Sequence, residues 1–89
     1  MERGVFINGR WHSPPGLDRF DIINPATAER VGTTLLADAL TVDRAVTAAE
    51  AAFAAFAALP ARTRADMLHK AAALIEADLE MMAALLTRE

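Results

Sequence analysis

The 89-residue sequence contains no cysteine. This absence excludes disulfide bonds, zinc sites built on thiolates and catalysis by a thiol nucleophile within these residues. Its four glycines form no phosphate-cradling loop between a strand and a helix. The sequence therefore predicts no catalytic residue and no cofactor-binding residue on this chain.

Long apolar runs are also missing. No segment approaches the roughly 18 apolar residues of a membrane-spanning helix, and residues 1–12 hold no run long enough for a secretory signal. The formal net charge is -3, and the basic residues are scattered, unlike the clustered positive charge of nucleic-acid-binding proteins. We expect a cytoplasmic chain without a membrane or nucleic-acid partner.

Side chains able to bind metals or transfer protons are few and dispersed. His12 and His69 are far apart, and neither has a second histidine at helical spacing. Glu76 and Glu80 share a helix face but carry like charges, as expected of a solvated surface. These residues predict no acid–base pair, and whether the chain binds a metal stays open.

Residues 1–40 hold all four glycines and three of the four prolines, a composition that predicts strands and turns. Residues 5–7 and 10–12 flank Asn8-Gly9, the dipeptide most favourable for a tight hairpin. Residues 20–23 and 30–36 flank the turn that starts at Asn24-Pro25. This region is therefore expected to form two β-hairpins.

Residues 41–89 change to a helical pattern. Thr41 is the expected N-cap of a first helix, which Leu59-Pro60 should end. A second helix is predicted over residues 61–87, with a break near Ala77 where Asp78 would cap a third helix. Its apolar stripe consists of Leu68, Ala71, Ala72, Ile75, Leu79, Met82, Ala83 and Leu86. The helices are expected to pack as a helical hairpin.

Together the two regions predict an α+β segment that forms one incomplete domain. The sequence is 54% hydrophobic, but much of that content is alanine, which favours helix and buries little area. The pattern therefore specifies helices more strongly than it specifies a core.

The order of these motifs resembles the amino-terminal segment of the aldehyde dehydrogenase superfamily, from about Val5 to the last residue. The resemblance rests on residues 7–9 with Trp11, on the Asn24-Pro25 turn, on residues 43–46, and on Arg64 followed by the stripe of the second helix. Where the family commonly has a glycine before Glu29, this chain has Ala28. A glycine there would tolerate positive φ at no steric cost.

The resemblance implies a part of an α/β, Rossmann-like cofactor domain. It implies oxidation of an aldehyde to a carboxylic acid, with NAD or NADP accepting the hydride. The family uses a cysteine thiolate, an asparagine and a glutamate whose motifs do not occur here, so the chain is expected to be inactive alone. It also implies a cation held partly by the main-chain carbonyls of Ile22 and Ile23.

Three hypotheses remain at this stage. The chain is an amino-terminal fragment of an aldehyde dehydrogenase, because family members usually continue beyond the point that matches Glu89. Alternatively, it is a helical interaction module that buries its stripe against a partner or another copy. In the third hypothesis, it is a subunit that a second polypeptide complements in trans. The implied partner is the remainder of an aldehyde dehydrogenase chain or a homo-oligomer.

Overall fold

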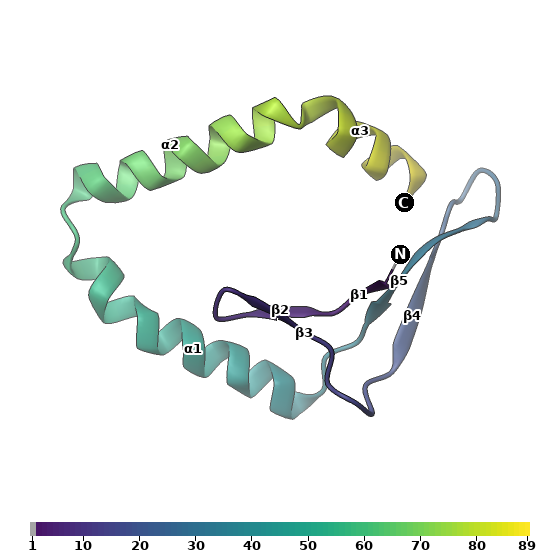
Figure 1. Ribbon diagram of the computed structural model, residues 1–89, viewed down its shortest axis with the longest axis horizontal. Helices are drawn as coiled ribbons and strands as arrows, with labels where there is room; N and C mark the ends of the chain where they lie inside the picture. The colour runs from purple at the N-terminus through teal and green to yellow at the C-terminus, as the bar shows by residue number, and fades with distance from the viewer. Residues whose placement is uncertain (1) are drawn as a thin grey trace.

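The computed structural model describes residues 2–89, which form strands followed by helices (Figure 1). The elements are β1 (Glu2–Arg3), β2 (Val5–Ile7), β3 (Arg10–His12), β4 (Arg19–Ile23), β5 (Arg30–Leu35), α1 (Ala39–Ala58), α2 (Ala61–Ala77) and α3 (Leu79–Arg88). The predicted α+β class is confirmed, whereas the link to a Rossmann-like domain stays a prediction.

The first hairpin forms as predicted. β2 and β3 are antiparallel, with Val5 opposite His12 and Ile7 opposite Arg10. Asn8 and Gly9 have φ values of 51° and 75°. Both central residues of a type I′ turn need positive φ, which asparagine and glycine adopt most easily.

The second hairpin pairs β4 with β5 in antiparallel register around the Asn24-Pro25 turn. The Oδ1 atom of Asn24 accepts hydrogen bonds from the backbone N–H groups of Ala26 (2.9 Å) and Thr27 (3.3 Å). The backbone N–H of Ala28 donates to the carbonyl oxygen of Asn24 (2.8 Å). Ala28 has a φ of 61°, so this position adopts the left-handed conformation that a glycine would tolerate at no steric cost.

One strand was not predicted from the sequence. β1 pairs in parallel with β5, with Arg3 opposite Thr34, and gives a three-stranded sheet of order β1-β5-β4. A two-residue strand has no periodicity that a sequence pattern can reveal. Its partner is about thirty positions away, so only the tertiary fold brings the two together.

Gly4 connects β1 to β2 where the backbone passes close to the end of β3. A Cβ atom at this position would collide with the carbonyl oxygen of His12 and lie 2.8 Å from Ser13 Oγ. We therefore expect Gly4→Ala to separate β1 from β5, because the backbone must move to relieve the clash. The N–H of Leu36 donates to Asp18 on the side of β4, so the N–H of the preceding residue, Leu35, faces β1. Loss of protection of the Leu35 amide in hydrogen exchange would show the separation, and unchanged protection would contradict it.

The N-cap of α1 is Asp38, so the prediction of Thr41 as the cap is wrong. Asp38 Oδ1 accepts hydrogen bonds from the backbone N–H of Thr41 (2.8 Å) and from its hydroxyl (2.6 Å). The helix starts at Ala39, whereas a cap at Thr41 would have placed its first residue at Val42. A carboxylate accepts both donors at once, which explains the earlier start.

The predicted ends of the other helices are confirmed. α1 ends at Ala58, before Leu59-Pro60. α2 ends at Ala77 and α3 starts at Leu79, with Asp78 between them. Asp78 joins α2 and α3 with φ and ψ of -105° and 16°, but its side chain makes no capping hydrogen bond. The break at this residue is therefore confirmed, whereas a capping role for its carboxylate is not observed.

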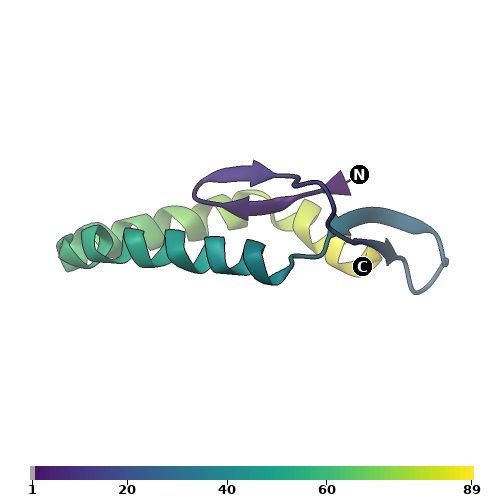
Figure 2. The same ribbon diagram turned by 90° about the horizontal axis from the view of Figure 1, so that it is seen from below.

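The expected packing of α1 against α2 is not observed. α2 reverses direction after Pro60, yet Figure 1 shows the two helices diverging along an open ring. Figure 2 shows the same ring from its side, where α1 lies in front of α2. No residue of α2 or α3 is buried, and in α1 only Thr41 is. Large apolar side chains stay exposed on both helices, among them Phe53 of α1 and Ile75 of α2, so neither helix covers the other.

The described residues have almost no core. Leu35 is their one buried hydrophobic side chain. The radius of gyration is 16.7 Å, compared with about 12 Å for a compact domain of this length. The accessible surface is 7342 Å², about 2,300 Å² more than a compact monomer of this mass exposes.

Candidate functional site

The residues first considered for chemistry do not meet. His12 lies in β3 and His69 in α2, on separate elements. Across residues 2–89 no three histidine, aspartate or glutamate side chains are placed to share a metal ion. Glu76 and Glu80 are both exposed and fall on either side of the Asp78 joint.

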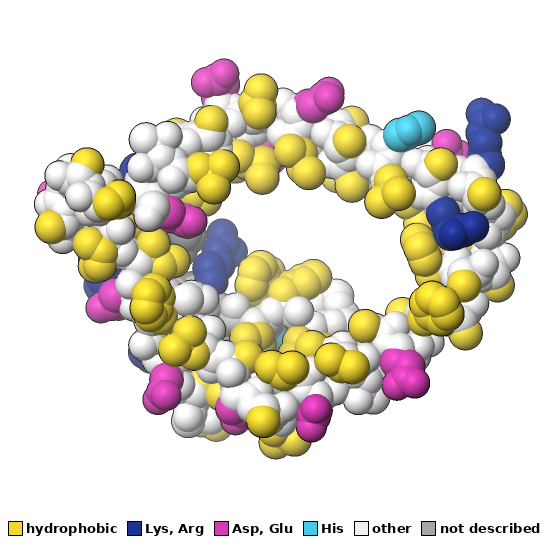
Figure 3. All heavy atoms as spheres, turned by 180° about the vertical axis from the view of Figure 1, so that it is seen from behind, with side chains coloured by type: hydrophobic (Ala, Val, Ile, Leu, Met, Phe, Trp, Pro, Cys, Tyr) yellow, Lys and Arg dark blue, Asp and Glu magenta, His cyan; other side chains and the backbone are white. Residues whose placement is uncertain are grey.

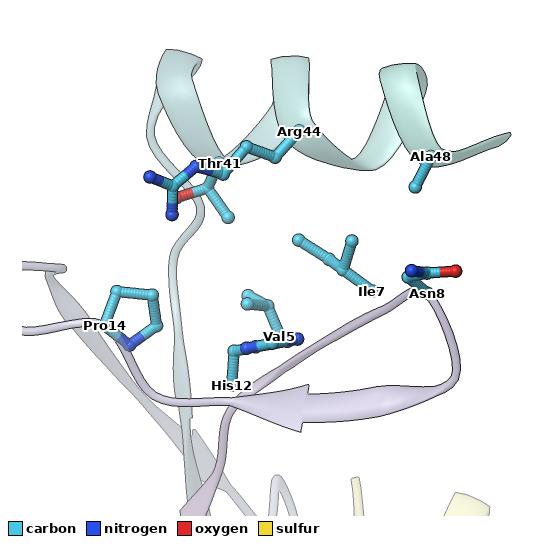
Figure 4. A pocket seen from close by; sticks show the side chains of 8 residues that line it. All are labelled: Val5, Ile7, Asn8, His12, Pro14, Thr41, Arg44 and Ala48. Carbon is cyan, nitrogen blue, oxygen red and sulfur yellow. The ribbon is translucent and has the colours of Figure 1, made fainter. Parts of the chain in front are cut away.

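The clearest concave feature lies between the first hairpin and α1. A hollow of about 280 Å³ is lined by Val5, Ile7, Asn8, His12, Pro14, Thr41, Arg44 and Ala48. Val5 and Ile7 point from β2 toward α1, and Arg44 extends over the hollow near Thr41 (Figure 4). The walls are mainly apolar, and the lining includes no acid.

A second hollow of about 330 Å³ lies where the hairpin turn approaches the middle of α1. It shares Ile7, Asn8 and Ala48 with the first, and its helical wall is made of alanines. The two hollows together show that the hairpin lies loosely on α1. They mark imperfect packing, and neither contains a nucleophile next to a base.

On the hairpin, an aromatic pair is exposed. The ring centroids of Phe6 and Trp11 are 5.1 Å apart, and the guanidinium carbon of Arg3 is 5.5 Å from the Trp11 centroid. Both residues are more than half exposed. These contacts stabilise the hairpin and link it to β1 through a cation–π interaction.

A small polar network crosses the second hairpin. The hydroxyl of buried Thr33 donates to Asp21 Oδ1 (3.0 Å). The guanidinium of Arg30 lies 3.8 Å from the same carboxylate oxygen, but both side chains are mostly exposed. Such an exposed pair contributes little to stability. The network orders the strand pair and has no catalytic geometry.

The proposed cation ligands lie at the end of β4. Ile22 and Ile23 flank an irregularity in the register with β5, directly before the Asn24 turn. Within residues 2–89, no group of three or more histidine, aspartate or glutamate side chains is placed there to complete a metal site. The cation site stays a prediction.

Extensive apolar surface is the dominant property of the molecule. Figure 3 shows an opening through the ring, with hydrophobic side chains along much of its rim. On α2 and α3 the large exposed side chains are Met67, Leu68, Leu74, Ile75, Leu79, Met81, Met82 and Leu86. Contiguous apolar surface of this extent is typical of an interface.

The fold and its surfaces define a class of protein before any comparison. This is an α+β segment that presents apolar faces, and within residues 2–89 no cluster of side chains is placed to hold a metal ion.

Comparison with known proteins identifies the family. The Aldehyde dehydrogenase family matches residues 11–89. Retinaldehyde dehydrogenase 3 of Rattus norvegicus is 39% identical over 88 residues, which cover 96% of this chain and 17% of the rat protein. The mitochondrial aldehyde dehydrogenase of Equus caballus is 38% identical over 86 residues, covering 93% of this chain and 17% of the horse protein. The chain belongs to the aldehyde dehydrogenase family.

The chain spans about a sixth of the length of the curated relatives it matches. Another relative is named cytosolic aldehyde dehydrogenase 1, from Elephantulus edwardii, and is 37% identical over 84 residues, covering 91% of this chain and 17% of that protein. No helix within residues 2–89 has the length and apolar content to cross a membrane. Because the relatives are named for different compartments, the cytoplasmic location stays a prediction.

Proposed function

We propose that this chain is the amino-terminal supporting segment of an NAD- or NADP-dependent aldehyde dehydrogenase and that it has no activity by itself. One observation carries the proposal: nearly the whole chain aligns with family members, yet it covers only 17% of the rat relative. The complete enzyme would oxidise an aldehyde to a carboxylic acid, with the dinucleotide accepting the hydride. The cofactor would bind to residues other than these.

The exposed surface supports this proposal. A segment with a single buried hydrophobic side chain and about 2,300 Å² of excess surface gains stability only when further protein covers it. The Nε atom of Arg64 is shielded from solvent and has no hydrogen-bond partner among residues 2–89. Buried polar groups normally have partners, so the partner of Arg64 is expected from the remainder of the enzyme.

In this proposal the segment forms the outer edge of a Rossmann-like cofactor domain in the cytoplasm. The Asn24 turn fixes the ends of β4 and β5, and its role is architectural. The carbonyls of Ile22 and Ile23 would provide part of a monovalent cation site, completed by ligands from the rest of the enzyme.

The test is an assay of the purified 89-residue chain with an aldehyde and either NAD or NADP. We expect no formation of reduced cofactor above the protein-free rate, because the chain has no cysteine to attack the carbonyl. We also expect no saturable dinucleotide binding by calorimetry. A complete family enzyme serves as the positive control, and turnover by the short chain alone contradicts the proposal.

A second candidate function is an interaction module, which the exposed apolar faces of α2 and α3 favour. A related possibility is a subunit complemented in trans by a cysteine-bearing polypeptide. Co-expression with the catalytic remainder of a family enzyme separates the two: restored aldehyde oxidation supports complementation, and a stable complex without activity supports the module.

A further inference from the structure

We propose that Arg64 fixes this segment to the remainder of the enzyme by forming a buried ion pair with an aspartate or glutamate of that remainder. The inference rests on the proposed function and deepens it, because it names the chemical group that meets the shielded guanidinium. Its failure can be told apart from failure of the proposed function, since the test changes single side chains in an enzyme whose parent form is assembled and active.

Arg64 lies at the beginning of the apolar face of α2. Leu68 follows four positions later, and Ala71 and Ile75 continue at helical spacing, so the four residues share one face of the helix. Leu68 and Ile75 are 67% and 52% exposed, whereas Arg64 is half-buried. This face therefore presents aliphatic surface with a single cation at its end.

No acid shares the helix face of Arg64. The positions three and four residues away on either side carry proline, alanine, methionine and leucine, and Asp66, two positions on, falls on a different side of the helix. The Nε atom of Arg64 is shielded from solvent and has no hydrogen-bond partner among residues 2–89. The guanidinium therefore depends on an acceptor outside α2.

That acceptor has to carry a negative charge. A guanidinium stays protonated in proteins, and it loses the water around it once further protein covers the apolar face of α2. A buried charge without a counter-charge is strongly unfavourable. A carbonyl oxygen would accept from Nε and leave the charge uncompensated, whereas a carboxylate accepts two N–H groups of the fork at once. The surface that meets α2 is therefore expected to be apolar, with one carboxylate opposite Arg64.

Arg62 provides a matched comparison in the same turn of α2. Its side chain is exposed, and Asp66 lies four positions on, close enough on the helix surface for a local pair. Arg62 therefore needs no acceptor from the remainder of the enzyme. The same substitution at the two arginines should have different consequences once the segment is covered.

The experiment compares Arg64→Met in two settings: the 89-residue chain alone, and a chimera in which this chain replaces the matching 88 residues of the rat relative. Methionine has a helix propensity close to that of arginine and carries no charge. In the chimera we expect Arg64→Met to lower the thermal midpoint by about 6 °C or more, because it leaves the partner carboxylate buried and unpaired. In the chain alone the midpoint should not fall, because no pair is lost. Arg62→Met should shift neither midpoint by more than about 2 °C.

Two further variants in the chimera separate a carboxylate from a neutral acceptor. Arg64→Lys keeps the charge, whereas Arg64→Gln keeps a hydrogen-bond donor without the charge. A carboxylate partner predicts that the lysine variant retains more of the thermal stability than the glutamine variant.

An equal or reversed order of the lysine and glutamine variants would overturn the proposal. Equal losses from Arg62→Met and Arg64→Met in the chimera would also overturn it, as would a loss from Arg64→Met of the same size in the chain alone. A parent chimera that does not fold or does not oxidise an aldehyde contradicts the proposed function itself, and this inference with it.

Discussion

Replacing Ala28 with glycine should stabilise the chain by about 1 kcal/mol, because an L-residue pays that cost in the left-handed conformation and glycine does not. Ala28 has a φ of 61° and closes the Asn24 turn through the hydrogen bond from its N–H to the Asn24 carbonyl oxygen. Urea unfolding followed by circular dichroism measures the change, which should appear as a higher midpoint with an unchanged slope.

Ala26→Gly provides the control in the same turn. Ala26 does not have a positive φ, so glycine there only increases the freedom of the unfolded chain and should destabilise the protein by about 0.5–1 kcal/mol. Opposite signs at the two positions are expected. If both substitutions destabilised the chain equally, the left-handed backbone conformation of Ala28 would not reduce the stability of the chain.

Asp38→Ala should fray the first turn of α1, because it removes the oxygen that accepts from the N–H and hydroxyl of Thr41. We expect reduced helicity and faster hydrogen exchange at Thr41. Asp38→Asn keeps an acceptor oxygen and should retain most of the helicity at neutral pH. A comparable loss in both variants would show that the negative charge, and not the capping oxygen, stabilises the helix.

The same carboxylate predicts an acid-dependent loss of stability. The hydrogen bonds from the hydroxyl and N–H of Thr41, with a smaller effect of Arg44, lower the pKa of Asp38 from its ordinary value of 3.8. Because the folded pKa lies below the unfolded one, this contribution is fully present above pH 3.8 and is lost as pH falls through the lowered folded value. Asp38→Asn should remove that part of the pH dependence. Identical acid unfolding curves for the variant and the parent would contradict this assignment.

Short-range turn chemistry explains which predictions succeeded. Three dipeptides restrict the backbone within a few residues: Asn8-Gly9, Asn24-Pro25 and Leu59-Pro60. Each of the corresponding turns and the end of α1 formed where it was predicted. The break at Asp78 is also confirmed, although its side chain makes no capping hydrogen bond. The N-cap was misassigned because Asp38 and Thr41 are both good caps, and the structure uses the aspartate to bind the threonine.

The surfaces around the hairpin and the helices could not be predicted from the sequence, because they depend on contacts between segments that are distant along the chain. The hollow beneath the hairpin forms only where β2 crosses α1, so its lining combines residues 5–14 with residues 41–48. The apolar stripe of α2 and α3 was visible in the sequence, but its exposure was not. The stripe alone favoured a packed helical pair, whereas the folded chain leaves it accessible.

The sequence by itself determined the order of strands and helices, the positions of the turns, and the absence of a cysteine nucleophile, because these follow from side-chain identity and from interactions over a few residues. Only the tertiary structure decided that β1 joins β5, that Asp38 caps α1 and that α1 and α2 stay apart. Pairing between distant segments depends on which surfaces gain most by contact, and here the apolar faces of α1 and α2 stay exposed instead of covering each other.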